Sequence, residues 1–195
     1  ELTRQMIDIP SVSGDEGPLA DAVEAALRDA GFGTLPSLEI LRDGDAVCAR
    51  TRLGLDQRVV LAGHLDTVPI ADNVPGRFEE RDGATVLWGR GSVDMLGGCA
   101  AALALACEVG AVLSGGDEAA LATDVTWIFY DHEEVASHLN GLGRVQRNHP
   151  EWLAGDLALL GEPTAAHVEG GCNGTLRVIA HFPGRAAHSA RAWMG

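Results

Sequence analysis

Short apolar segments alternate with longer segments of mixed or small residues along most of the chain. The apolar segments predict strands, which in chain order cover residues 47–51, 58–62, 85–88, 124–130, 157–160 and 175–181. Helices are predicted over residues 2–9, 15–30, 97–109 and, in part, 135–148. Strands that alternate with helices predict an α/β fold in which a doubly wound, mostly parallel sheet carries helices on both faces.

The predicted helix over residues 97–109 consists almost wholly of small residues, mainly glycine and alanine. Small side chains let a helix approach a sheet closely, so we expect this helix to pack directly on the central strands. No apolar run reaches the length that we expect of a membrane span.

The net charge and the cysteine content limit the kinds of binding partner and the cellular location that we expect. The chain has 195 residues and a formal net charge of −14, which argues against nucleic acid and against anionic membrane surfaces as partners. A charge of this sign suits a protein that holds cations. The cysteines are scattered, without a Cys-x-x-Cys pair, and no secretory leader is visible. We therefore expect a reducing, cytoplasmic location and cysteines that fill the core.

Residues 125–134, Val-Thr-Trp-Ile-Phe-Tyr-Asp-His-Glu-Glu, change from β-branched and aromatic residues to charged ones within one position. The apolar half predicts a buried central strand. The acidic half would lie beyond its carboxyl end, where open α/β sheets bind ligands. Adjacent carboxylates at Glu133 and Glu134 repel each other, and one takes up a proton unless a cation lies between them. Taken alone, this stretch leaves a solvated acidic turn as an equal alternative.

Polar clusters follow other apolar strands in the same way: His64 with Asp66, then Asp94, then Glu162. The carboxyl ends of parallel strands share one edge of a sheet, so we expect these clusters to meet Glu133 and Glu134 there. Imidazole with several carboxylates is a ligand set for Zn²⁺, Co²⁺ or Mn²⁺. The set holds more acids than one ion requires, which suggests two ions that share a bridging carboxylate.

His64 and Asp66 are two residues apart and therefore point to the same side of an extended chain. Asp66 can then accept the second imidazole N–H and fix the tautomer of His64. Taken alone, such a pair is more often a buried core histidine beside a turn residue.

Other catalytic signatures are incomplete in this sequence. Gly89-Arg90-Gly91 matches the start of a dinucleotide-binding loop, but Asp94 occupies the position of the third glycine and would repel a pyrophosphate. Neither a Walker loop nor a Gly-x-Ser-x-Gly elbow occurs. We expect His132 to flank the site without binding metal, and spacing alone leaves the role of His188 open.

Several segments together resemble the M20 family of di-zinc amidohydrolases and peptidases. The matching segments are Gly63-His64-Leu65-Asp66-Thr67-Val68-Pro69, Gly89-Arg90-Gly91-Ser92-Val93-Asp94-Met95, Asp131-His132-Glu133-Glu134 and Gly161-Glu162-Pro163-Thr164. The resemblance extends over essentially the whole chain. Residues 131–135, 140–143 and 171–177 are most similar to the subgroup that hydrolyses N-succinyl amino acids.

The resemblance implies a set of metal ligands. His64, Asp94 and Glu162 would hold one zinc ion, and Asp94, as the bridging carboxylate, and Glu134 would hold the other. Co²⁺ or Mn²⁺ could substitute for zinc. The resemblance also implies a cis peptide bond between Asp94 and Met95.

The resemblance further implies catalytic roles. Glu133 would be the general base, Asp66 would orient His64, and His188 would reach an active site across a dimer to stabilise an oxyanion. The substrate would be a small N-acyl amino acid, and the reaction would be hydrolysis of its amide. Another M20 deacylase, a carboxypeptidase and a non-catalytic metal-binding fragment are the alternatives.

The resemblance also implies a domain division. Residues 1–173 would form the metal-binding catalytic domain without its returning C-terminal segment, and residues 174–195 would begin a lid and dimerisation domain. Two departures stand out. Leu96 replaces the lysine that is usual after Asp-Met, and the chain is much shorter than family members and lacks a distal histidine ligand. We therefore expect a homodimer for the complete protein and a monomer for this chain.

Overall fold

The computed structural model describes residues 1–117, 121–171, 178–181 and 183–194. The chain divides into two compact units, Glu1–Pro163 and Thr164–Gly195. The domain boundary predicted between residues 173 and 174 falls among residues 172–177, outside the described residues, so it stays a prediction.

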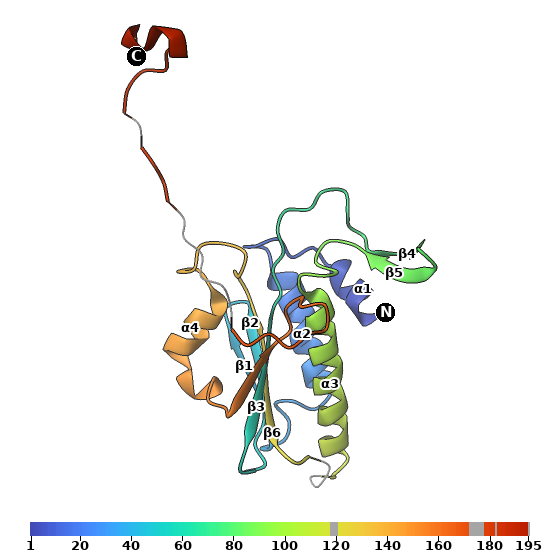
Figure 1. Cartoon of the computed structure of the whole chain (residues 1–195). Coiled ribbons are helices and arrows are strands. Elements are labelled where there is room, and N and C mark those ends of the chain that lie inside the picture. The colour runs from blue at the N-terminus through green and yellow to red at the C-terminus, as the bar shows by residue number, and fades with distance from the viewer. Residues whose placement is uncertain (118–120, 172–177, 182, 195) are drawn as a thin grey trace. The chain divides into compact units, whose positions relative to one another are not determined.

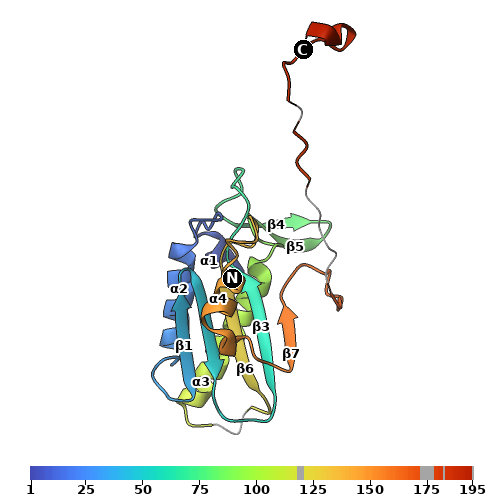
Figure 2. The ribbon, with the colours of Figure 1, turned by 90° about the vertical axis from the view of Figure 1, so that its left-hand side faces the viewer.

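A five-stranded sheet forms the centre of the first unit, with strand order β1-β2-β6-β3-β7 (Figure 2). Its strands are β1 (Leu38–Asp43), β2 (Ala46–Thr51), β3 (Arg58–His64), β6 (Asp124–Tyr130) and β7 (Leu157–Leu160). β3 pairs in parallel with β6 and with β7, whereas β1 and β2 extend the sheet as an antiparallel hairpin. The predicted α/β class is confirmed, with a sheet that mixes parallel and antiparallel pairs.

The hairpin of β1 and β2 explains the antiparallel part of the sheet. A turn at Gly44, with φ of 60°, joins the two strands, and so short a connection permits only antiparallel pairing. β1 is absent from the sequence prediction because charged residues interrupt its apolar pattern. The pairing strand offsets one of those charges, since Arg50 of β2 lies 2.6 Å from the carboxylate of Glu39 in β1. β4 (Arg77–Arg81) and β5 (Ala84–Trp88) form a small separate antiparallel hairpin. Of these two strands, the sequence predicts only β5.

Helices cover both faces of the sheet, as predicted (Figure 1). α2 (Gly17–Asp29) and α3 (Leu96–Ser114) pack on one face, and α1 (Leu2–Ile7) packs against α3. α4 (Gly141–Asn148) packs on the other face, against β2 and β6. Asn140 begins α4, because its side-chain oxygen accepts the N–H of Gly143 at 3.1 Å.

The small residues of α3 bring the helix directly onto the sheet, as expected. A Cβ atom on Gly98 would collide with the carbonyl oxygen of Gly161, which follows β7. A Cβ atom on Gly63 of β3 would lie 2.6 Å from Met95 and 2.8 Å from the sulfur of Cys99. Larger side chains at these positions would push α3 away from the strand ends.

By length and composition alone, α3 could also cross a membrane, so the expectation that no apolar run reaches that length is wrong. One such helix is weak evidence for a membrane span, because core helices pass the same test. α3 contacts α1, α2, β3 and β6, and it buries leucine, cysteine and alanine side chains against them. Its apolar character is therefore accounted for by the core of this unit.

The core confirms β6 as the buried central strand. Every residue of β6 is buried, and Trp127 meets Phe32 edge to face with ring centroids 5.8 Å apart. Cys48 and Cys99 are buried, as expected for core residues, and Cys107 is partly buried.

The prediction that residues 157–160 form a buried strand is right about the strand and wrong about its burial. Leu157, Leu159 and Leu160 are 53%, 48% and 54% exposed. β7 is the edge strand, and among the described residues it pairs only with β3. An apolar run indicates a strand, but the position of that strand in the sheet decides its exposure.

The second unit carries a short 3₁₀ helix, η3 (Ser189–Met194). The strand predicted over residues 175–181 is not formed by residues 178–181, and residues 175–177 lie outside the described part of the chain.

Candidate metal centre

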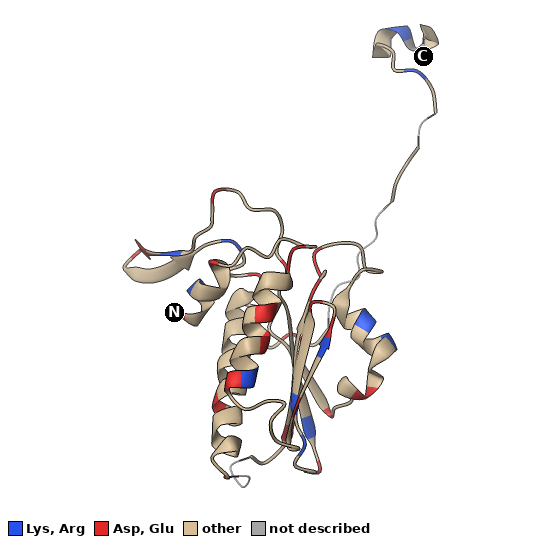
Figure 3. Cartoon of the chain, turned by 180° about the vertical axis from the view of Figure 1, so that it is seen from behind, with Lys and Arg blue, Asp and Glu red and all other residues tan. Residues whose placement is uncertain are grey.

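The parallel strands β3, β6 and β7 bring His64, Glu133 and Glu162 to one edge of the sheet. Asp94 comes instead from the loop between β5, which belongs to the separate antiparallel hairpin, and α3, so the expectation that it follows a strand of the parallel sheet is wrong. In the β3–β6 pairing His64 lies opposite Tyr130, so β3 ends beside the turn that carries Glu133 and Glu134. β7 ends at Leu160, two residues before Glu162. Figure 3 shows acidic stretches on the loops at this end of the sheet.

His64 is the centre of two groups of possible metal ligands. His64 is 1% exposed, and its Nε2 atom lies 3.1 Å from Oδ1 of Asp94 and 4.0 Å from Oε1 of Glu162. In each group the ligand atoms lie within 4.8 Å of one another: His64, Asp94 and Glu162 form one, and His64, Glu133 and Glu134 form the other. The first group contains the three residues predicted to hold one ion. The second brings both adjacent glutamates to the same imidazole.

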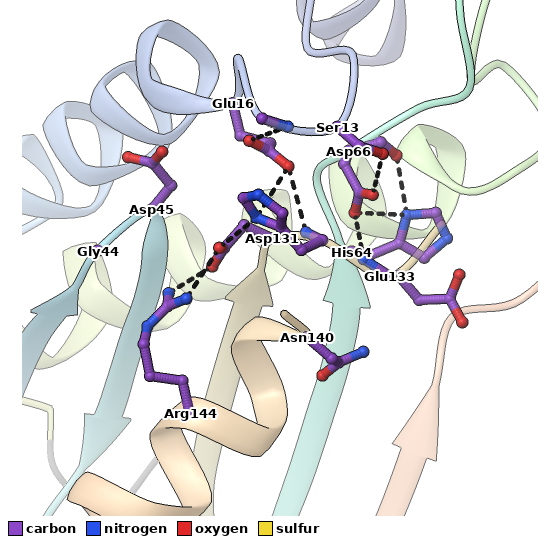
Figure 4. Close-up of polar contacts among 12 residues, drawn as sticks. Ser13, Glu16, Gly44, Asp45, His64, Asp66, Asp131, Glu133, Asn140 and Arg144 are labelled. Carbon is purple, nitrogen blue, oxygen red and sulfur yellow. Dashed lines mark hydrogen bonds and ion pairs between the residues drawn. The ribbon is translucent and has the colours of Figure 1, made fainter. Parts of the chain in front are cut away.

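Asp66 contacts His64 differently from the prediction. The Nδ1 atom of His64 lies 2.9 Å from the main-chain oxygen of Asp66 and 3.5 Å from its carboxylate. The main-chain oxygen is therefore the closer acceptor. The carboxylate is engaged elsewhere, because it accepts the N–H groups of Glu133 and Glu134 and the hydroxyl of Ser13, as Figure 4 shows in part. With Nδ1–H donated to Asp66, a neutral imidazole turns its Nε2 lone pair toward Asp94 and Glu162.

The charges of His64 and Asp66 support each other. Burial disfavours the charged imidazole, but hydrogen bonds to Asp66 and the charges of Asp66 and Glu162 outweigh it and raise the pKa of His64 to about 9. Burial likewise disfavours the Asp66 carboxylate. The nearby imidazole of His64, with hydrogen bonds from the N–H groups of Glu133 and Glu134 and from the hydroxyl of Ser13, nevertheless lowers the pKa of Asp66 to about 2. Asp66 is therefore a fixed anion behind the imidazole.

The remaining carboxylates are crowded with negative charge. Burial raises the pKa of Glu134, and the charges of Asp94 and Glu133 raise it further. The pKa of Glu162 is raised in the same way, by burial and then by Asp94, Glu133 and Glu134. A divalent cation among these side chains would replace the protons that they otherwise favour. The donor set and its charge thus fit a metal centre of the zinc, cobalt or manganese type.

The peptide bond between Asp94 and Met95 is cis, as predicted. Leu96 is 1% exposed and belongs to the core, so at this position the chain presents no charged side chain to the site. His132 lies beside the cluster but belongs to neither ligand group among the described residues. His188 is exposed within the second unit, where its Nδ1 atom accepts the N–H of Ala190 at 3.2 Å.

Sequence reasoning missed a second layer of polar residues behind the cluster: Ser13, Glu16, Asp131 and Arg144. Glu16 and Asp131 are buried, and both contact His132. The only local signal for Glu16 is its place at the start of a helix, where an acidic residue ordinarily caps the helix or faces solvent.

Residues 60–181 match the sequence profile of peptidase family M20/M25/M40. The chain belongs to this family. Its relatives include the succinyl-diaminopimelate desuccinylase of Corynebacterium glutamicum, which is 51% identical over 194 residues, 100% of this chain and 49% of the relative. The putative succinyl-diaminopimelate desuccinylase DapE of Mycobacterium tuberculosis is 50% identical over 195 residues, 100% of this chain and 50% of the relative.

The chain therefore spans about half the length of these curated M20 relatives. Among solved structures, human carnosine dipeptidase 1 superposes with a TM-score of 0.60 at 18% identity, over 81% of this chain and 36% of that one. At that identity the likeness supports the M20 fold alone.

Proposed function

We propose that this chain supplies the metal-binding part of an amide hydrolase that cleaves N-succinyl-LL-diaminopimelate to succinate and LL-diaminopimelate, a step of lysine and diaminopimelate biosynthesis. The observation that carries the proposal is the cluster around His64 in a chain that matches curated desuccinylases along its whole length. The cluster supports metal-assisted hydrolysis, and the relatives support the choice of acyl group.

In this proposal His64, Asp94 and Glu162 hold one zinc ion, and Asp94 and Glu134 hold a second. Such ions, when bound, lower the pKa of water and stabilise negative charge on a carbonyl oxygen. The Nε2 atom of His64 is the nitrogen that faces Asp94 and Glu162, and a bound ion would displace its proton. The hydrogen bond between Nδ1 and the main-chain oxygen of Asp66 therefore favours ligation through Nε2. Co²⁺ or Mn²⁺ are the proposed substitutes.

Glu133 is the proposed general base. It takes a proton from water as the water oxygen forms a bond to the amide carbon, and it gives that proton to the amine nitrogen as the C–N bond breaks. Its main-chain N–H is bonded to Asp66, so the residue that orients His64 also positions the base. We propose that His188 stabilises the developing oxyanion from the lid of a partner subunit in a cytoplasmic homodimer.

The test compares substrates with the complete protein that contains this chain. We expect turnover of N-succinyl-LL-diaminopimelate to exceed turnover of N-acetylornithine and of a dipeptide by at least about 10-fold in kcat/KM, the smaller end of discrimination by one pocket. Metal content is measured on the same samples. Preference for the acetyl substrate or the dipeptide would assign the chain to another M20 activity, and bound metal without turnover of any of them would support a non-catalytic metal-binding protein.

A further inference from the structure

His132 leaves strand geometry directly before the two adjacent glutamates of the metal centre. Its φ is 58°, in the left-handed region that residues other than glycine rarely adopt. β6 ends at Tyr130, so His132 lies where the chain leaves the sheet. The positions of Glu133 and Glu134 therefore depend on what holds His132 in this conformation.

The carboxylate of Glu16 holds the backbone of His132. Glu16 is 0% exposed, its Oε1 atom accepts the N–H of His132 at 3.2 Å, and the same atom lies 3.4 Å from the imidazole Nδ1. Its Oε2 atom accepts the N–H of Gly14 at 2.9 Å. Glu16 stands at the N-cap of α2, yet its side chain makes no capping hydrogen bond to that helix. A buried carboxylate that could cap its own helix instead binds a turn far along the chain.

Successive main-chain N–H groups in this turn are held by two buried carboxylates. Glu16 accepts the N–H of His132, and Asp66 accepts those of Glu133 and Glu134 at 2.9 and 3.0 Å. The two acceptors come from different parts of the chain, one before α2 and one after β3. Figure 4 shows them on either side of the turn. Together they fix the main chain through the residues that carry the proposed base and a proposed ligand.

Asp131 also holds the His132 side chain. Its Oδ2 atom lies 2.7 Å from Nδ1 of His132, and both of its oxygens accept bonds from Arg144, at 2.6 and 3.0 Å. The bidentate guanidinium offsets the charge of Asp131 and ties it to α4. Both carboxylates thus face the Nδ1 atom of His132, with Asp131 the closer of the two.

We propose that Glu16 is a positioning residue, which holds His132 in its left-handed conformation and thereby sets the positions of Glu133 and Glu134. Glu16 belongs to neither ligand group among the described residues. The predicted effect of Glu16 on catalytic turnover rests on the proposed function. Its predicted effect on the conformation of residues 132–134 does not.

The experiment compares Glu16→Gln with Asp124→Asn in the complete protein. Glutamine keeps the size of the side chain but offers one carbonyl oxygen, so it cannot accept from both Gly14 and His132. Asp124 is the matched control, because it is also buried and accepts main-chain N–H groups, those of Leu53, Gly54 and Leu55, at the opposite end of β6.

The first readout is amide hydrogen exchange in the metal-free protein, which needs no activity. Glu16→Gln should speed exchange in residues 132–134 by about 10-fold or more and leave β6 protected, because only the turn loses an acceptor. Asp124→Asn should speed exchange near residues 53–55 and leave the turn unchanged. Unchanged exchange at residues 132–134 in Glu16→Gln would overturn the proposal.

The second readout is turnover at a temperature where both variants are folded. Glu16→Gln should lower kcat by about 10- to 100-fold with KM within about threefold, since misplacing a base acts on the chemical step. Asp124→Asn should keep kcat within about twofold, because a remote loss of stability does not act on the folded enzyme. An equal loss of kcat in both variants would show that Glu16 contributes to stability and does not position Glu133, which would overturn the proposal.

A double variant tests whether Glu16 acts on Glu133 and Glu134 through the backbone conformation of His132. Glycine adopts the left-handed conformation readily, so Glu16→Gln/His132→Gly should recover at least about threefold of the lost kcat. No recovery would overturn the route through His132. If Glu16→Gln does not fold, Glu16→Asp, which is one methylene shorter, carries the same predictions. Absence of turnover in the unmodified protein would reject the proposed function, and the exchange data would still decide the role of Glu16.

Discussion

The Oδ1 atom of Asp66 accepts a 2.9 Å hydrogen bond from the main-chain N–H of Glu133. Asp66 lies two residues after the proposed ligand His64, and Glu133 is the proposed base. Asp66 thus connects the two, because its main-chain oxygen faces His64 of β3 and its carboxylate binds the turn after β6. Because the connection runs through main chain as well as side chain, substitution of Asp66 should affect metal binding and catalysis together.

Asp66→Asn should weaken zinc binding by about 10- to 100-fold and lower kcat in the complete enzyme, because an amide replaces one acceptor oxygen by a donor that faces N–H groups. Isothermal titration with zinc and steady-state kinetics measure the two effects. Ser13→Ala is the control, since it removes only one hydroxyl that donates to Asp66. If Asp66→Asn bound zinc as tightly as the control, the Asp66 carboxylate would not contribute to positioning His64.

Glu133→Gln should retain metal and lose turnover by about 10²- to 10⁴-fold, because an amide cannot take the proton. Kinetics and metal analysis of the complete enzyme are needed together, since Glu133 lies within ligand distance of His64. Loss of metal in this variant would show that Glu133 is a metal ligand. Activity within a few-fold of the unmodified enzyme would show that Glu133 is not the base.

The 195-residue chain alone should bind zinc once tightly and at most once weakly, and it should be nearly inactive. His64, Asp94 and Glu162 form a complete group of three ligands, whereas the group with Glu133 and Glu134 shares the same imidazole. Carboxylates without an imidazole of their own hold zinc less tightly. Titration of zinc into the metal-free chain measures both events, and two equally tight events would contradict the ligand assignment.

Asp124 gives a prediction about pH. Burial raises the pKa of Asp124, but bonds from the N–H of Leu53, the hydroxyl of Thr51 and the N–H of Leu55, with the charge of Arg58, lower it overall. A carboxyl whose pKa is lower in the folded state stabilises the fold above its unfolded pKa of about 3.9, and this stabilisation is lost as the pH falls below that value.

Asp124→Asn should therefore reduce the free energy of unfolding by about 1–3 kcal/mol at neutral pH, through unsatisfied main-chain N–H groups. The difference from the unmodified protein should shrink as the pH falls below about 4, where Asp124 of the unfolded chain begins to take up a proton. Urea unfolding at pH 7 and at successively lower pH measures the difference. A gap that stays constant with pH would show that the charge of Asp124 does not contribute.

The sequence by itself determined the α/β class and the buried central strand, and it predicted that His64, Glu133 and Glu162 lie at one edge of the sheet. Apolar runs that end in His64, in Glu133 and Glu134, and in Glu162 identify strand ends, and parallel strands carry their ends to one edge. The small residues of the segment after Asp94 likewise indicate a helix that must approach the sheet closely. These features depend on the local pattern of residues, which can be read from the sequence without knowing how distant segments pack.

Only the tertiary structure decided the rest. The exposure of β7 depends on its edge position, and the antiparallel addition of β1 depends on its neighbour in the sheet. The main-chain oxygen of Asp66 is the closer acceptor for His64 because the carboxylate is occupied by other donors. Glu16 acquires its contact with His132 across 116 residues. A hydrogen bond between distant segments is set by how the elements pack, and spacing along the chain carries no information about it.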